Sequence, residues 1–128
     1  PKVLLINKYS ASDGDLFPWS FKANKIGKVI GTRTWGGIVG ISGPLPYMDG
    51  TDVRVPFFTN YDAKTGQWIV ENHGVDPDIL IDNDPVKEQL GEDQQLNKAI
   101  EVILQELKDR KPLPPVPAPR TYKDLGVE

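Results

Sequence analysis

The stretch VLLINKYSASDGDLF, residues 3–17, decides the fold class of this chain. It opens with an uninterrupted apolar run at residues 3–6, which is typical of a strand buried on both faces of a parallel sheet. The run stops at Asn7, and the acidic residues Asp13 and Asp15 favour the first turn of a helix a few residues later. A buried strand that leads directly into a helix predicts an α/β protein.

The residues that follow complete a strand–helix–strand unit. We expect the helix to span residues 13–26 and to end before Gly27, because its apolar residues recur at roughly helical spacing (Phe17, Phe21 and Ile26). Pro18 must then lie in the first turn, where its missing N–H has no cost. Residues 28–33 predict the next strand.

The middle of the chain is rich in glycine and predicts short strands joined by turns. Residues 38–41 are expected to form one strand. Residues 52–58 and 67–72 predict a hairpin with its turn near residues 64–66. Residues 78–82 predict one further short strand.

The C-terminal part predicts two helices. Asp84, Pro85 and Gly91 carry the cap, first-turn and C-terminal signals of a short helix. A longer helix is expected over residues 94–109 with Asp93 as its N-cap, because one stripe of it is apolar (Leu96, Ile100, Ile103 and Leu107).

Composition excludes several classes of function. At 128 residues, with 38% hydrophobic and 26% charged residues, the chain is long enough for one compact domain with a single core. A net charge of −3 provides no basic field for nucleic acid or anionic lipid. Cysteine is absent, and no apolar run approaches the ~18 residues that span a membrane. Since dinucleotide and P-loop spacings are also absent, we expect no metal, cofactor, nucleic acid or membrane partner.

The sharpest functional question concerns Ser12. A serine before an acidic helix start is in most proteins a cap, whose hydroxyl accepts a backbone N–H. The alternative is a nucleophile, which needs a strand-to-helix turn that exposes the hydroxyl and a backbone donor, here the N–H of Asp13, that can stabilise an oxyanion. Spacing alone favours the cap and leaves the nucleophile open.

A nucleophile also needs a base, and the chain contains one histidine, His73. A lone histidine in a loop is more often a surface or hydrogen-bonded residue than a catalyst or a metal ligand. Asp76 and Asp78 flank a proline and favour a polar turn over acid–base chemistry. We expect the larger aromatic residues in the core or in hairpins, with a peptide groove as the alternative (Trp19, Trp35, Phe57, Phe58 and Trp68).

Four stretches together resemble the C-terminal part of tricorn-type peptidases: SASDGDLF, GKVIGTRTWGGIVGIS, VENHGVDPDI and DQQLNKAIEVILQEL. The similarity runs over most of the chain. These peptidases belong with the tail-specific, or C-terminal-processing, serine proteases, which have a ClpP/crotonase-like core. The resemblance implies a partial crotonase-like α/β spiral of short strands, with a nucleophile-bearing helix and a long C-terminal helix.

The resemblance also implies roles for individual residues in the hydrolysis of oligopeptides. The serine of the family's SDGD element, here Ser12, is the nucleophile, and the amide of Asp13 supplies one donor of the oxyanion hole. In the tail-specific branch the base is a lysine, and its position is occupied here by Gly37. Tricorn-type enzymes use a histidine instead, which is held by a serine and, through it, by a glutamate that corresponds to Glu71.

In the family the histidine, its serine and the glycine that gives the second oxyanion donor lie upstream of the nucleophile. This chain begins at Pro1 directly on an apolar strand, and we expect it to be a piece of a longer polypeptide that is nearly inactive alone. Residues 1–110 should be the C-terminal half of a catalytic domain, and residues 111–128 a proline-rich extension that is extended or polyproline II. Expected partners are the upstream polypeptide, further copies in a homo-oligomer and an oligopeptide substrate. The expected compartment is the cytoplasm, with the periplasm as the alternative.

Two other functions stay open at this point. The same fold could serve as a non-catalytic peptide-binding or scaffold domain in which Ser12 is only a cap. A crotonase relative that handles acyl-CoA would use oxyanion amides without a serine nucleophile, so it would stay active after Ser12→Ala.

Overall fold

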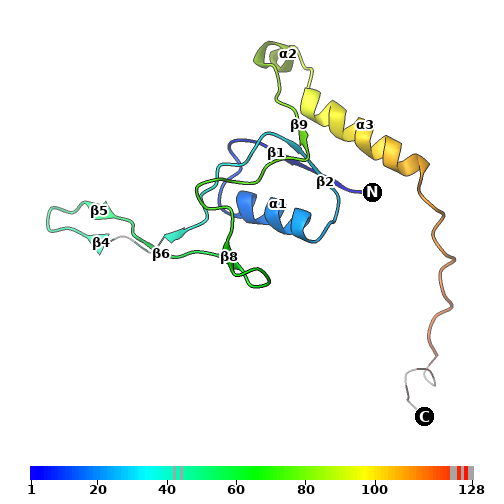
Figure 1. Cartoon of the computed structure of the whole chain (residues 1–128), viewed down its shortest axis with the longest axis horizontal. Coiled ribbons are helices and arrows are strands. Elements are labelled where there is room, and N and C mark those ends of the chain that lie inside the picture. The colour runs from blue at the N-terminus through cyan, green and yellow to red at the C-terminus, as the bar shows by residue number, and fades with distance from the viewer. Residues whose placement is uncertain (42, 44, 122–123, 125, 127–128) are drawn as a thin grey trace.

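A three-stranded parallel sheet with strand order β1-β2-β9 forms the centre of the molecule (Figure 1). The computed structural model describes residues 1–41, 43, 45–121, 124 and 126. The strands of this sheet are β1 (Val3–Ile6), β2 (Lys28–Gly31) and β9 (Ile79–Leu80), and the helices are α1 (Asp13–Ala23), α2 (Pro85–Gln89) and α3 (Gln94–Lys108). The three strands predicted for this sheet are confirmed, the second and third with shorter bounds.

Helices α1 and α3 cover the sheet. Phe21 of α1 packs with Ile6 and Val29 in a buried cluster. Successive side chains of a strand alternate between faces, so the fully buried Ile30 points to the other face, and α3 also contacts β1 and β2. The predicted strand–helix–strand unit is therefore confirmed, and it supplies the buried cluster.

Pro18 lies inside α1 and not in its first turn, which corrects the sequence prediction. The helix begins at Asp13, so Pro18 is its sixth residue. A proline at this position has no N–H for the carbonyl of Gly14, four residues earlier. The helix also ends three residues before its predicted end, because Asn24 closes it by donating from its backbone and side-chain N–H groups to the carbonyl of Ser20.

Residues 40–68 form an arm that extends away from the sheet (Figure 1). Its strands pair as three antiparallel ribbons: β3 (Gly40–Ile41) with β6 (Pro56–Phe58), β4 (Leu45–Pro46) with β5 (Asp52–Val53), and β7 (Tyr61–Asp62) with β8 (Gln67–Trp68). The strand predicted at residues 38–41 is present only in its last two residues. The hairpin predicted between residues 52–58 and 67–72 is wrong, because a turn at residues 47–50 folds β5 and β6 back onto β4 and β3. The turn near residues 64–66 exists, but it joins β7 to β8.

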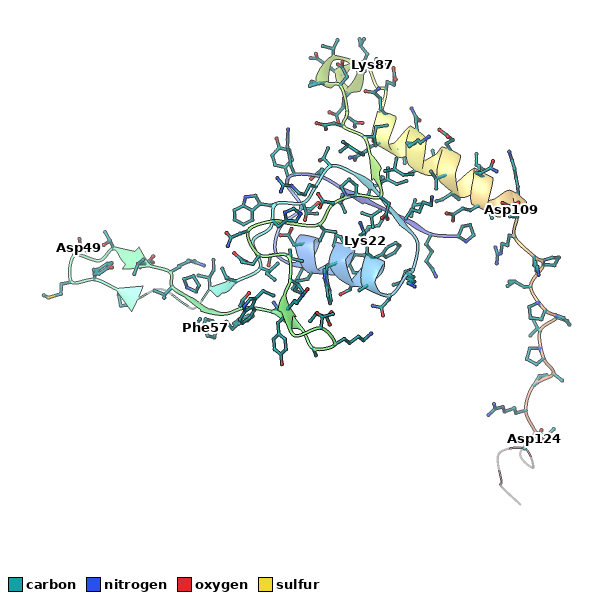
Figure 2. All side chains as sticks on the ribbon, viewed as in Figure 1. Lys22, Asp49, Phe57, Lys87, Asp109 and Asp124 are labelled. Carbon is teal, nitrogen blue, oxygen red and sulfur yellow. The ribbon has the colours of Figure 1, made fainter. Side chains whose placement is uncertain are left out.

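Aromatic side chains of the arm pack on each other and not in the core. Phe57 and Phe58 meet edge-on with ring centroids 5.0 Å apart, yet both rings and that of Trp68 are more than half exposed (Figure 2 labels Phe57). These three residues are hairpin residues, as expected. Trp19 is half-buried on α1, whereas Trp35 is 68% exposed and contradicts the expected core or hairpin position. The segment that carries Trp35 is held through its backbone, which leaves the ring in solvent.

Both predicted C-terminal helices are confirmed. Asp84 caps α2 and Asp93 caps α3, each through a carboxylate that accepts backbone amides. The buried face of α3 differs from the prediction, because Ala99 is buried whereas most of the expected stripe is exposed (Leu96, Ile100 and Leu107). The small side chain of Ala99 lets the helix approach the sheet closely, so the contact centres on it.

Gln95, in the first turn of α3, joins this helix to the sheet. Its side-chain N–H groups donate to the carbonyl of Ile6 at 3.1 Å and to that of Ile81 at 3.3 Å. The helix is thereby attached to the last residue of β1 and to the residue that follows β9.

The described residues 110–121 after α3 form neither helix nor strand. The remaining positions of the predicted extension, 122–123, 125 and 127–128, lie outside the described residues. Within the described part of the chain, no helix is both long and apolar enough to cross a bilayer.

Ile30→Ala should lower the free energy of unfolding by about 2–5 kcal/mol, because the side chain is fully buried and its truncation leaves a cavity. Leu80→Ala in the neighbouring strand is the control: this side chain is 77% exposed, and its loss should change stability by less than ~0.5 kcal/mol. Urea denaturation followed by circular dichroism measures both. Equal losses in the two variants would contradict the position of Ile30 in the core.

Asp78 links the start of β9 to β2 and α1. Its Oδ2 accepts the amide of Val29 at 2.8 Å, and its Oδ1 lies 3.0 Å from Nζ of Lys22, which Figure 2 labels. Partial burial raises the pKa of Asp78, but the hydrogen bond from Val29 and the charge of Lys22 together outweigh it, so this pKa lies below the usual value for aspartate. The carboxylate therefore stabilises the fold above the unfolded-state pKa of about 3.9, and this contribution is lost as the pH falls through the lower pKa of the folded state.

Asp78→Asn should lower stability at pH 7 and weaken its dependence on pH below about pH 4, because the amide can accept from Val29 but carries no charge for Lys22. Thermal unfolding of parent and variant in steps from pH 7 into the acid range measures the effect. Parallel acid profiles for the two proteins would show that Asp78 does not contribute in this way.

Candidate active site

Ser12 lies at the bend between β1 and α1 and is the N-cap residue of this helix. Its backbone has φ 57° and ψ −114°, a region that residues other than glycine rarely occupy. The residue is exposed. The turn therefore presents Ser12 to solvent, as a nucleophile would require.

Ser12 and Asp15 form a capping box at the start of α1. The amides of Asp15 and Leu16, which a capping side chain would serve, donate to the carbonyl oxygen of Ser12 at 2.9 and 3.0 Å. In the other half of the box, the Ser12 N–H donates to Oδ2 of Asp15 at 3.0 Å. The carbonyl of Ser12 thus serves the first amides of α1, while the residue stays exposed.

The amide of Asp13, the first residue of α1, donates to no group among the described residues. Unpaired amides are normal in the first turn of a helix, and they lie at the positive end of the helix dipole. Next to an exposed serine hydroxyl, such an amide is a donor of the kind that stabilises an oxyanion.

A buried carboxylate holds this turn to a neighbouring segment. Asp15 is 0% exposed, and besides the Ser12 amide it accepts the amides of Gly36 at 2.9 Å and Gly37 at 3.1 Å. The carbonyl of Gly37 in turn accepts the Ser12 N–H at 3.2 Å. The segment of residues 34–39 therefore lies directly beside the Ser12 turn.

Glu71 holds the other end of this segment. Its Oε2 accepts the amides of Ile38 at 2.7 Å and Val39 at 3.0 Å. The side chain is half-buried, and its Oε1 has no hydrogen-bond partner within the described part of the chain. Ser12 and Glu71 are thereby attached to the consecutive residues Gly37 and Ile38.

This glutamate sits on a turn with an unusual backbone. Val70 and Asn72 on either side have φ of 65° and 62°, and the Asn72 amide donates to the carbonyl of Gly36 at 2.8 Å. His73 in the same turn is exposed, and its Nε2 lies 2.8 Å from Oδ2 of Asp76. This is the hydrogen-bonded surface position expected for it. No cluster of histidine and acidic side chains that could hold a metal occurs among the residues described.

A cavity of about 300 Å³ opens where the three parallel strands end. Its lining is mostly polar and includes Asn7, Lys8, Tyr9, Thr32, Asp82, Asn83, Pro85, Glu88 and Gln95. It adjoins the first half of the loop that leads to Ser12 but does not include that residue. Because its walls carry a lysine and carboxylates together, it favours neither a cation nor an anion.

Sequence reasoning singled out Ser12, Asp13 and Glu71 but not the groups that join them. The spacing of Ser12 and Asp15 is that of a capping box and could have predicted the bond between them. The bonds from Asp15 to Gly36 and Gly37 have no local signal, because these residues are 21 and 22 positions away.

Comparison with known families defines the class of protein. Residues 1–81 match the family model described as peptidase family S41. The chain therefore belongs to peptidase family S41, a family of serine proteases.

Individual relatives agree with this assignment. The chain is 44% identical over 111 residues to the tricorn protease of Thermoplasma volcanium, across 87% of this chain and 11% of that protein. The crystal structure of the tricorn protease matches with a TM-score of 0.74 at 43% identity, over 83% of this chain and 10% of that one. The photosystem II D1 C-terminal processing protease matches with a TM-score of 0.51 at 29% identity, over 64% of this chain and 20% of that one. The resemblance to tricorn-type and C-terminal-processing proteases is confirmed, and the chain spans about a tenth of the tricorn relatives.

Gly36→Ala should disturb the site far more than Gly50→Ala, although both glycines have positive φ, 89° and 84°. A Cβ on Gly50 meets open space, so that change costs about 1–2 kcal/mol for the left-handed backbone alone. A Cβ on Gly36 would lie 2.5 Å from the backbone nitrogen of Gly74, which forces the Glu71 turn to move. Hydrogen exchange at residues 36–39 should accelerate only in the Gly36 variant. Equal protection in both variants would contradict this close contact.

Proposed function

We propose that this chain is the part of an S41 serine peptidase that carries the nucleophile, Ser12, and the orienting glutamate, Glu71. The observation that supports the proposal best is the position of Ser12, which is exposed at a bend with positive φ between strand and helix and next to the unpaired amide of Asp13. Membership of the S41 family supports the same assignment.

The proposed reaction is hydrolysis of a peptide bond by acyl transfer. Oγ of Ser12 attacks the peptide carbonyl while a base takes its proton, and the resulting oxyanion accepts a hydrogen bond from the Asp13 amide. The base returns the proton to the leaving amine, and water then hydrolyses the acyl-enzyme with the help of the same base. We assign the base to a histidine of the upstream polypeptide, since His73 is paired with Asp76 and Gly37 occupies the lysine position.

Glu71 is proposed to orient that histidine through an intervening serine. The amides of Ile38 and Val39 fix its Oε2, which leaves Oε1 as the atom that would accept the serine hydroxyl. A carboxylate held in this way would favour the imidazolium that forms during acylation.

The complete activity belongs, in this proposal, to a longer polypeptide. The chain spans about a tenth of the tricorn proteases that it matches, and we assign residues 1–110 to the C-terminal half of a crotonase-like catalytic domain and residues 111–128 to an extension. The proposed substrates are oligopeptides, and the proposed partners are the upstream polypeptide and other copies in a cytoplasmic homo-oligomer. Exposed aromatic residues on the arm support such association (Tyr47, Phe57, Phe58, Tyr61 and Trp68).

Ser12→Ala in the complete polypeptide should reduce peptide hydrolysis by ~10⁴-fold or more and abolish labelling by a fluorophosphonate probe, because both need the Ser12 oxygen. A fluorogenic peptide measures turnover, and mass spectrometry identifies the labelled residue. Ser20→Ala, which removes a hydroxyl from the same helix, should retain both activities.

Labelling at another residue, or unchanged turnover in Ser12→Ala, would reject the proposal. A complete polypeptide that binds peptides but shows neither label nor turnover would be the non-catalytic scaffold domain.

A further inference from the structure

We propose that Asp15 is the positioning residue of the nucleophile: its buried carboxylate sets the backbone of Ser12 and, through it, the direction of the Ser12 hydroxyl and the Asp13 amide. The proposal rests on the peptidase function proposed above and concerns how that site is built. Three observations carry it: the burial of the carboxylate, the backbone of Ser12 and the link to Glu71.

Asp15 places a carboxyl group inside the protein without an ion-pair partner. It is 0% exposed, and its carboxylate makes no ion pair with any described residue. Its partners are three backbone amides, those of Ser12, Gly36 and Gly37. As the third residue of α1 it also lies at the favourable end of the helix dipole. An apolar residue could fill a buried position at less cost in desolvation, so a buried carboxylate here points to the work done by its hydrogen bonds.

The backbone of Ser12 needs such support. Its φ of 57° with ψ of −114° is sparsely populated and persists only where surrounding contacts over-determine it. The Ser12 N–H is shared between Oδ2 of Asp15 and the carbonyl of Gly37, and the Ser12 carbonyl accepts the amides of Asp15 and Leu16. Both polar groups of the Ser12 backbone are therefore fixed, and Asp15 takes part on each side.

The same carboxylate ties Ser12 to the segment that Glu71 holds. Four consecutive amides, at residues 36–39, are bound by two carboxylates: Asp15 takes the first two and Glu71 the last two. Loss of Asp15 would release the first pair and leave the second in place, so the nucleophile could shift relative to Glu71. A displacement of about 1 Å in a catalytic group can cost ~100-fold in rate.

Asp15→Asn is the sharpest test, because it keeps the shape of the side chain but replaces one acceptor oxygen with an NH₂ group that cannot accept an amide. In the complete polypeptide, kcat for a fluorogenic peptide should fall about 100-fold while KM changes less than about threefold. Fluorophosphonate labelling of Ser12 should slow by the same factor. The final labelled fraction should stay near that of the parent, because the folded protein still presents the serine.

Hydrogen exchange gives a readout that does not depend on activity. In Asp15→Asn at least one of the amides at residues 36–37 should exchange faster, because Gly36 and Gly37 bond different oxygens of Asp15 and only one oxygen remains, while the amides at residues 38–39 stay protected by Glu71. Asp93→Asn is the matched control, since it makes the same atomic change in a carboxylate that caps α3. It should leave turnover, labelling and the exchange of residues 36–39 unchanged.

A second variant, Asp15→Glu, keeps the proposal testable if Asp15→Asn does not fold. Asp15→Glu keeps both acceptor oxygens and moves them by one methylene, so it should show the same fall in kcat with little change in KM. Labelling rates are normalised to the final labelled fraction, so that a loss of folded protein does not imitate a loss of rate.

Labelling of both Asp15 variants within about threefold of the parent rate would overturn the positioning role. A parent that is not labelled at Ser12 would instead reject the peptidase proposal. In that event, unchanged protection at residues 36–37 in Asp15→Asn would overturn the proposal for Asp15 as well, and faster exchange there would support it.

Discussion

A carboxylate buried without a counter-ion organises the turn at Ser12. Hydrogen bonds must replace the water that such a group loses, and Asp15 obtains them from the amides of Ser12, Gly36 and Gly37. The dependence is mutual, because the buried Gly36 amide would lose its acceptor if the carboxylate were removed. One side chain thus satisfies backbone groups from two segments that are far apart in the sequence.

The central sheet brings these segments together. β1 leads into the Ser12 turn and its neighbour β2 leads into residues 34–39, so the two loops leave the sheet side by side. Residues 34–37 then lie between two partners: Trp35 donates to the carbonyl of Ser10 on one side, and Thr34 exchanges hydrogen bonds with Val75 on the other. The loops therefore keep the neighbour order of the strands that lead into them. There the carboxylates of Asp15 and Glu71 accept backbone amides, in place of the regular hydrogen bonds between strands.

Prediction from sequence succeeded where the cause of a structure is local. Asp84 and Asp93 bond amides two or three positions away, so both C-terminal helices were predictable with their caps. Strand pairing in the arm was not, because residues 52–58 can pair with the residues before them or after them, and the turn at residues 47–50 selects the pairing with the residues before them. Pro18 shows a different limit: propensity favours the first turn, but a helix that begins at Asp13 makes Pro18 its sixth residue. Within the site, sequence patterns singled out the chemical groups, whereas the contacts that align them come from tertiary structure.

Gln95 connects the C-terminal helix α3 to the start of the loop that leads to Ser12. Its side chain holds the carbonyl of Ile6, the last residue before that loop, and the carbonyl of Ile81 on the far side of β2. Since Lys108 follows Gln95 by 13 residues in α3, the helix extends about 20 Å from this attachment point. The far end of α3 at Lys108 is therefore connected, through the helix and Gln95, to Ile6, from which the loop that presents Ser12 begins.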